Sequence, residues 1–121
     1  MKMYVVTDLD LFVESNGDPG FDQTAVAVTY TLDKAVECVN SIIESWNNDM
    51  HEDMVENPTL ANELDELWMM DRKATDKELL GGEFVEYYRR KSKDGSSHIC
   101  RIFIEEVDVL EDSDLIIEGE A

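Results

Sequence analysis

The first 30 residues alternate between apolar and turn-forming segments, a pattern that predicts a β-hairpin. Residues 4–13 are rich in Val, Leu and Phe, and residues 16–20 (NGDPG) combine the residue types that stop strands and form turns. Residues 25–30 (AVAVTY) again favour a strand. Because a turn separates the two segments, we expect them to pair antiparallel.

Helical periodicity begins after this hairpin. From Leu32 to Trp46 the apolar residues recur at steps of three and four, which is the spacing of one buried helix face. Thr31 is a suitable N-cap, and Asp33 places a negative charge in the first turn, near the positive end of the helix dipole. The sequence therefore predicts a helix here, followed by a polar and acidic connection over residues 47–56.

Residues 57–82 have the start and stop signals of two further helices. Asn57 and Pro58 favour a helix start, and an apolar stripe then reaches to about Lys73. Thr75 with Glu78 three residues later fits a capping box, and the glycine pair at 81–82 should end that short helix. We expect a helical segment between the strands.

A second hairpin is predicted near the C-terminus. Residues 84–91 favour a strand, and Asp94-Gly95 is typical of a tight turn. In the returning strand the apolar positions change phase near Glu105 and Glu106, so we expect a β-bulge there. Residues 111–121 are expected to form an acidic tail.

These elements give the order β-β-α-α-β-β. The predicted fold class is α+β, with an antiparallel sheet of two hairpins and helices packed on one face. At 121 residues the chain has the size of a single domain, 1–121. Its hydrophobic fraction of 43% separates it from the class of chains that stay disordered.

Charge is the main functional clue. The net charge is −19, and residues 1–71 hold 16 acidic residues against two basic ones. A surface this acidic repels phosphate, so a direct nucleic-acid ligand is excluded, and a basic nucleic-acid-binding protein becomes the expected partner. Acidity that serves only solubility is the alternative interpretation.

Most of the basic residues lie between positions 72 and 101. Those at 89–101 are interleaved with Tyr87 and Tyr88, a combination that also occurs in RNA-binding patches. In a domain this acidic we instead expect these bases to pair with acids across the second hairpin.

One short motif resembles a catalytic one. Residues 4–12 (YVVTDLDLF) look like the first motif of haloacid-dehalogenase-type phosphatases, in which Asp8 would be the nucleophile and Asp10 the acid/base. That family continues with Gly and Thr, where this chain has Leu11 and Phe12. We therefore expect a plain strand in which Asp8 and Asp10 share a solvated face, while Leu9 and Leu11 face the core.

No other set of residues predicts a reaction, a metal or a cofactor. His51 and His98 have no potential ligand at helical spacing, and no Gly-rich phosphate loop is present. Cys38 and Cys100 lack CxxC spacing, so we expect a buried, reduced pair of thiols. The chain is not expected to be an enzyme.

The candidate site is the set of carboxylates expected on exposed helix faces and on the connection between the helices. Acids repeating at about one helical turn can occupy an Arg/Lys groove built for phosphates, through charge-assisted hydrogen bonds. The candidate partner-binding residues are Asp33, Glu37, Glu44, Asp49, Glu52, Asp53, Glu56, Glu63 and Glu66.

In this overall character the chain resembles small acidic phage-encoded anti-defence proteins, which include anti-CRISPR and anti-restriction inhibitors. That resemblance implies a non-enzymatic inhibitor, encoded by a phage or mobile element. It would act in the cytoplasm of the host cell, blocking the nucleic-acid site of a CRISPR effector or restriction enzyme by nucleic-acid mimicry.

Two alternatives stay open. One is an immunity protein or antitoxin that neutralises a basic toxin. The other is an acidic accessory domain that forms a homo-oligomer, such as a homodimer, through a subunit contact made by Trp68, Met69 and Met70. In all three interpretations we expect no membrane partner, because the apolar runs are far shorter than the roughly 20 residues that cross a bilayer.

Overall fold

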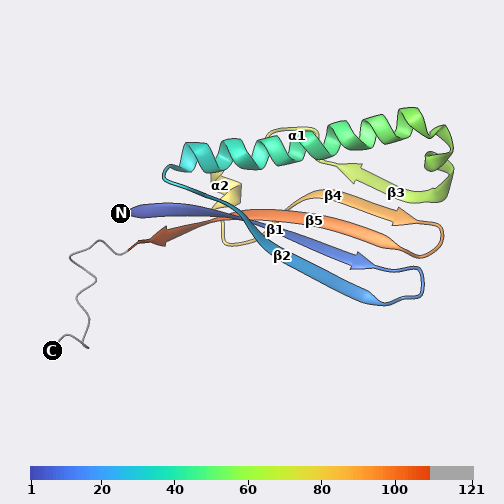
Figure 1. Cartoon of the computed structure of the whole chain (residues 1–121), viewed down its shortest axis with the longest axis horizontal. Helices are drawn as coiled ribbons and strands as arrows, with labels where there is room; N and C mark the ends of the chain where they lie inside the picture. Colours follow the sequence, from blue (N-terminus) through green and yellow to red (C-terminus); the bar gives the residue numbers. More distant parts are fainter. Residues whose placement is uncertain (110–121) are drawn as a thin grey trace.

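The computed structural model describes residues 1–109 and shows an α+β fold, with a five-stranded antiparallel sheet covered on one face by a long helix (Figure 1). The acidic tail predicted over 111–121 lies outside the described residues.

The elements are, in chain order, β1 (Lys2–Val13), β2 (Pro19–Thr29), α1 (Leu32–Glu56), the 3₁₀ helix η1 (Pro58–Glu63), β3 (Leu64–Met69), α2 (Asp76–Leu79), β4 (Val85–Ser92) and β5 (Ser97–Asp108). The strand order in the sheet is β2-β1-β5-β4-β3.

The N-terminal hairpin is confirmed, and its second strand is longer than predicted. β2 pairs antiparallel with β1 along nearly the whole of both strands. Gly17 supports the turn with a φ of +90°, a conformation that residues with a Cβ rarely adopt. β2 begins at Pro19 rather than near Ala25. Its polar first half is compatible with a strand because β2 is an edge strand and is largely exposed to water.

Helix α1 begins as predicted but ends ten residues later. The Thr31 side chain accepts a hydrogen bond from the backbone N–H of Lys34, which caps the first turn. The predicted connection over 47–56 is wrong, because Met50 and Met54 extend the apolar stripe into this polar segment and pack on the core. No helix within residues 1–109 combines the length and the apolar character needed to span a membrane.

The predicted second helix is also wrong. Its first residues form η1, and its remainder forms β3, which pairs with the edge of β4. In β3 the less exposed Leu67 and Met69 alternate with the exposed Glu66 and Trp68, which is the period of a strand. The spacing of Leu60, Leu64 and Leu67 fits a helix, and pairing with β4 overrides it. Leu64 and Leu67 lie opposite Ser92 and Arg90, because the register shifts between Leu64 and Glu66.

The C-terminal hairpin is confirmed, with its turn at Asp94-Gly95. The bulge predicted at residues 105–106 is wrong, because β5 pairs with β1 in one continuous register from Ser97 to Asp108. Val107 instead lies on the sheet face opposite to Ile104. A bulge lies in β4 between Glu86 and Tyr88, and it allows two consecutive tyrosines to be buried.

The core lies between α1 and the sheet. Val39 and Ile43 of α1 are buried with Val6 of β1 and Ile102 of β5, and all four are at most 4% exposed. Trp46 continues this packing toward the other end of the helix, with its ring 4.8 Å from that of Tyr88. The helix therefore covers the sheet along most of its own length (Figure 1).

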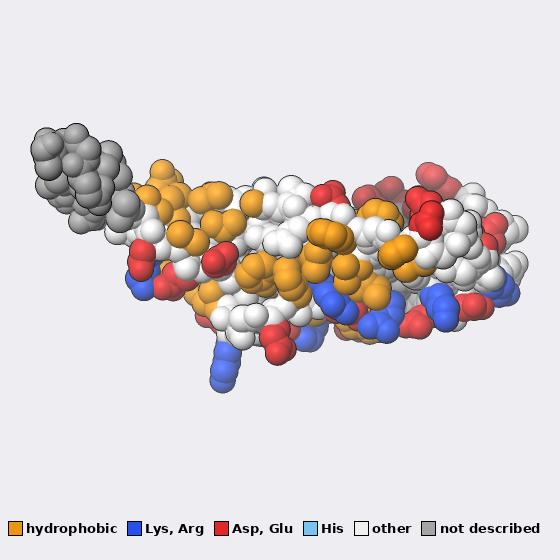
Figure 2. All heavy atoms as spheres, turned by 90° about the horizontal axis from the view of Figure 1, so that it is seen from below, with side chains coloured by type: hydrophobic (Ala, Val, Ile, Leu, Met, Phe, Trp, Pro, Cys, Tyr) orange, Lys and Arg blue, Asp and Glu red, His pale blue; other side chains and the backbone are white. Residues whose placement is uncertain are grey.

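The other face of the sheet, which we call the open face, has no covering element among the described residues. Figure 2 views the molecule from this side and shows hydrophobic side chains along much of its length, with charged side chains concentrated along one edge. Phe21, Val28 and Trp68 are 71%, 57% and 44% exposed. The register places Leu9 and Leu11 of β1 on this face beside Phe21.

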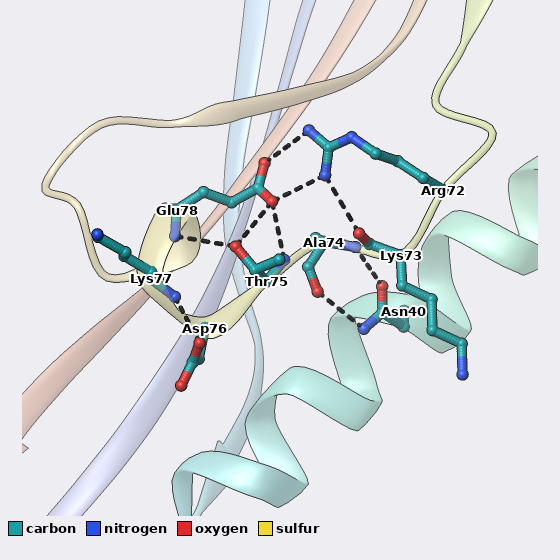
Figure 3. A network of polar contacts seen from close by, with 8 residues as sticks. All are labelled: Asn40, Arg72, Lys73, Ala74, Thr75, Asp76, Lys77 and Glu78. Atoms are coloured by element: carbon teal, nitrogen blue, oxygen red, sulfur yellow. Dashed lines mark hydrogen bonds and ion pairs between the residues drawn. The ribbon is translucent and has the colours of Figure 1, made fainter.

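Residues 72–78 are held by polar contacts (Figure 3). The Asn40 side chain on α1 bonds both the N–H and the carbonyl of Ala74, at 2.8 and 3.3 Å. The capping box predicted for Thr75 and Glu78 is confirmed. The Glu78 carboxylate also accepts two hydrogen bonds from Arg72, at 2.8 and 3.0 Å. These bonds from Arg72, together with the Thr75 N–H, lower the pKa of Glu78 from 4.5 to about 2.

The Glu78 contacts predict a specific pH dependence of stability. Glu78→Gln keeps an acceptor but loses the charge, so the free energy of unfolding at neutral pH should fall by about 1 kcal/mol. Because the folded-state pKa is depressed, the wild-type advantage is present above pH 4.5 and shrinks as the pH falls toward about 2. Urea unfolding of both proteins across this pH range measures it.

The matched control is Glu83→Gln, at an exposed position with no ion pair within residues 1–109. This control should unfold like the wild type throughout. A constant difference between E78Q and the wild type from pH 7 to pH 2 would contradict the assigned role of the Glu78 charge.

Candidate functional site

Seven of the nine predicted partner-binding acids lie on one element, α1, and all seven are exposed. The predicted split between a helix and a following loop is replaced by one helix of 25 residues. It carries the seven acids in two groups, three toward its N-terminal end and four toward its C-terminal end, and helical geometry turns the two groups to different sides. At 1.5 Å per residue this helix is about 37 Å long. The seven residues, called the α1 acids below, are Asp33, Glu37, Glu44, Asp49, Glu52, Asp53 and Glu56.

Glu63 and Glu66 do not lie on this helix. The prediction that they lie one helical turn apart is wrong, because Glu63 ends η1 while Glu66 is in β3. Glu66 projects from the open face of the sheet, where its carboxylate is 3.8 Å from the Arg89 guanidinium. Tertiary structure therefore assigns Glu66 to a different surface.

The α1 acids have little internal neutralisation. Within residues 1–109, a single ion pair involves them, between Lys34 and Glu37 at 3.4 Å. The expected pairing of the basic residues across the second hairpin is confirmed for Arg101 of β5, which contacts Glu86 of β4 at 3.5 Å. Arg89 contacts the same carboxylate at 3.0 Å, but from within β4. Arg90, Lys91 and Lys93 form no ion pair within residues 1–109. None of these basic residues neutralises the α1 acids.

Four of the α1 acids lie close together toward the C-terminal end of the helix, where their charges destabilise it. Asp49, Glu52, Asp53 and Glu56 are spaced three and four residues apart, so like charges face one another along the helix surface. They also approach the C-terminal end of the helix, whose dipole is negative, and the last turn has no basic residue. This arrangement works against the stability of the free protein.

Asp8 and Asp10 are not on the solvated face predicted for them. Asp8 lies opposite Ile102 and Asp10 opposite Cys100, both of which point toward the helix-covered side of β5. The packing of α1 on this side reverses the predicted orientation of β1, and it is Leu9 that faces outward.

The Asp8 carboxylate accepts a hydrogen bond of 2.8 Å from the Tyr87 hydroxyl. Burial raises the pKa of Asp8 above its ordinary value, while the bond from Tyr87 opposes that rise. The pKa of Tyr87 is raised far above its usual range, first by burial and then by the neighbouring Asp8 charge. The tyrosine thus remains a neutral donor.

Asp10, His98 and Cys100 form a second polar group beside this pair, called the Asp-His-Cys cluster below. The Cys100 thiol donates to the Asp10 carboxylate at 3.1 Å and lies 3.4 Å from His98 Nε2. The distance from His98 Nε2 to Asp10 Oδ1 is also 3.4 Å. Burial, followed by the bond to Asp10, raises the pKa of Cys100 well above its ordinary value.

The sequence interpretation missed this cluster. Helical spacing gives His98 no partner, and Cys100 was predicted to be a plain buried thiol, yet residues two apart in a strand point to the same face. Their joint orientation was therefore readable from the sequence. The contribution of Asp10 was not, because it depends on the register between β1 and β5.

The predicted subunit contact uses residues 68–70, but the fold places these side chains in different environments. Trp68 is exposed on the open face, whereas Met70 is 4% exposed and belongs to the core, and Met69 packs against it. Any contact at this position would therefore use Trp68 with the other apolar side chains of the open face.

Comparison of the chain with protein-family models, with curated proteins and with solved structures finds no significant match to any of them.

The contact between Tyr87 and Asp8 can be tested by removing one hydroxyl. Tyr87→Phe keeps the buried ring but leaves a half-buried carboxylate without its donor, so the free energy of unfolding should fall by about 2 kcal/mol. Denaturant unfolding at neutral pH measures this change.

Tyr30→Phe is the matched control, because Tyr30 is 71% exposed and has no side-chain hydrogen bond within residues 1–109. Its stability should equal that of the wild type. Equal stability of Y87F and Y30F would show that the Tyr87–Asp8 bond does not support the fold.

Proposed function

We propose that this protein is a non-enzymatic inhibitor that binds a basic nucleic-acid-binding protein through α1. The partner class is a host defence nuclease or effector, such as a CRISPR effector or a restriction enzyme. The α1 acids would occupy the groove that holds nucleic-acid phosphates and so exclude the nucleic acid by steric competition.

The observation that carries this proposal is the presence of seven exposed acids on a single helix. On a helix about 37 Å long they provide roughly one carboxylate per 5 Å. Phosphates along one strand of duplex DNA are spaced by about 3.4 Å, so the helix has about two thirds of the linear charge density of one strand. A rigid helix also keeps the carboxylates in place, which lowers the entropy lost on binding.

The energetic cost of the α1 acids supports a role in binding rather than in solubility alone. Acids placed anywhere on the surface raise solubility, and acids near the N-terminal end of a helix also stabilise it. Here four of them lie toward the C-terminal end at mutually repulsive spacings. A surface that destabilises its own helix is typical of selection for an external partner.

Carboxylates at this density suit recognition by guanidinium and ammonium groups. Each can accept charge-assisted hydrogen bonds from Arg or Lys, and the summed field accelerates the encounter with a basic groove. Binding of this kind weakens as salt screens the charges. The proposed interaction therefore has a measurable electrostatic signature.

The first test identifies and displaces a partner. The tagged protein is used to capture proteins from host lysate with and without nuclease treatment, and the captured protein is then purified with its labelled nucleic acid. Displacement of the label that weakens with rising salt supports mimicry. Capture of a toxin without nucleic-acid displacement would favour the antitoxin alternative, and a partner that still binds its nucleic acid would overturn the proposed mechanism.

The second test separates binding from stability. Replacing Asp49, Glu52, Asp53 and Glu56 together by Asn or Gln should weaken partner affinity by about 10- to 100-fold. The same change should raise the free energy of unfolding by about 1 kcal/mol, because it relieves repulsion along the helix and at its C-terminal end. Titration calorimetry and urea unfolding measure the two quantities.

A matched control makes the same change in net charge at exposed acids outside α1. The control replaces Glu14, Asp65, Glu83 and Glu105 by Gln or Asn. This control should retain partner affinity within about threefold. Its free energy of unfolding should not rise, because no repulsion along α1 is relieved. Equal losses of affinity in both variants would mean that net charge, rather than the α1 surface, drives binding.

The open face of the sheet favours a second, compatible function, which is homodimerisation. Its exposed Phe21, Val28 and Trp68 form an apolar surface, and its basic side chains Arg89 and Arg101 are paired with acids. The charges of the open face are therefore better neutralised than those of the helix side. A second copy of this acidic chain would meet less electrostatic repulsion at the open face. Such a dimer would leave both α1 helices facing outward.

Dimerisation predicts a mass that rises with concentration in sedimentation equilibrium. Phe21→Ser combined with Trp68→Ser should raise the dissociation constant at least about tenfold, since both apolar side chains would lie in the interface. Val55→Ser removes an apolar side chain that is 66% exposed on α1 and should have no effect. A monomeric wild type at about 100 µM would exclude this second function.

A further inference from the structure

The Asp-His-Cys cluster has the dimensions of a transition-metal site. Its three donor atoms, Asp10 Oδ1, His98 Nε2 and Cys100 Sγ, are separated by 3.1, 3.4 and 3.4 Å. Ligands bound tetrahedrally at about 2.0–2.3 Å from zinc lie about 3.3–3.6 Å from one another. The triangle therefore needs to widen by only a few tenths of an ångström to receive an ion.

We propose that Asp10, His98 and Cys100 bind one Zn²⁺ ion, with water in the fourth position. The donor set of one carboxylate oxygen, one imidazole nitrogen and one sulfur matches the borderline-soft character of zinc. Calcium and magnesium prefer oxygen ligands alone, so this set disfavours them. The site is independent of the α1 surface and of the partner proposed for it.

The surroundings of the cluster orient the imidazole ligand. The His98 ring packs edge-on against Trp46 and against Tyr88, with centroids 5.6 Å away in both contacts. These two contacts come from different elements, α1 and β4, and they restrict rotation of the ring. An oriented ligand loses less entropy when a metal binds.

Negative charge beside the cluster attracts a cation. Asp8 lies two residues before Asp10 on the same face of β1, and Asp22 of β2 lies directly opposite Asp10. Binding of Zn²⁺ to the Asp10 carboxylate and the Cys100 thiolate would replace the thiol proton by a divalent cation. The ion would then neutralise the two negative ligands.

Solvent can reach the cluster. The side chains of Asp10 and His98 are 31% and 29% exposed, whereas Cys100 is fully buried. His98 also lines a shallow surface hollow with Phe12, Glu14 and Arg90. An ion can therefore enter from the carboxylate and imidazole side and meet the thiol beneath.

Cobalt substitution tests the site directly, because a thiolate ligand gives Co²⁺ a charge-transfer band in the near ultraviolet. The full chain is stripped with a chelator and titrated with Co²⁺, then with Zn²⁺ in competition. We expect one bound ion per chain, a thiolate band that Zn²⁺ abolishes, and a melting temperature that rises by at least about 3 °C with zinc.

The chain supplies its own matched controls, since it has two cysteines and two histidines. Cys100→Ser and His98→Gln should weaken metal affinity at least about 100-fold, because each removes a ligand. Cys38→Ser and His51→Gln change the same residue types outside the cluster and should bind as the wild type does. Circular dichroism without metal checks that each variant is folded.

Two results would overturn the proposal. The first is a wild type that shows neither a thiolate band nor a zinc-dependent melting temperature. The second is a thiolate band that persists in the folded C100S or H98Q variant, or one that disappears in the C38S variant. Each of these outcomes would mean that the ion is bound by other ligands. None of these readouts depends on partner binding, so failure here and failure of the proposed function are distinguishable.

Discussion

The packing of α1 across one face of the sheet is the constraint on which the other features depend. It decides which side of β1 and β5 is buried, and the continuous register between these strands then orients every side chain along them. Asp8 and Asp10 are turned toward the helix by this choice, while Leu9 and Leu11 are left on the open face. A register shifted by one residue would exchange the two sets.

The same packing separates two surfaces of different chemistry. The exposed side of α1 is strongly negative and has one ion pair among the seven α1 acids within residues 1–109. The open face is apolar at its centre, and its charges are largely paired, as with Arg101 and Glu86. A helix that is continuous over 25 residues places all seven of these carboxylates on one element.

Polar groups under the helix are held by mutual contacts. Burying the Asp8 carboxylate is unfavourable, and the bond from the Tyr87 hydroxyl offsets part of that cost. The neighbouring Asp10 accepts from the Cys100 thiol instead. These contacts connect β1, β4 and β5 across the interior, so a chain with strong surface repulsion has specific polar bonds as well as apolar packing in its core.

Local signals in the sequence determined the α+β class, both hairpins, the start of α1 at its Thr31 cap and the capping box at Thr75. Each depends on residues close in the chain. The sequence also identified the seven acids that α1 carries.

Tertiary structure decided where α1 ends, because Met50 extends the helix only by packing on the core. It likewise made β3 a strand, because pairing with the edge of β4 overrides a leucine spacing that fits a helix. Finally, it brought Asp10 to His98 and Cys100, because register between strands 90 residues apart has no local signal.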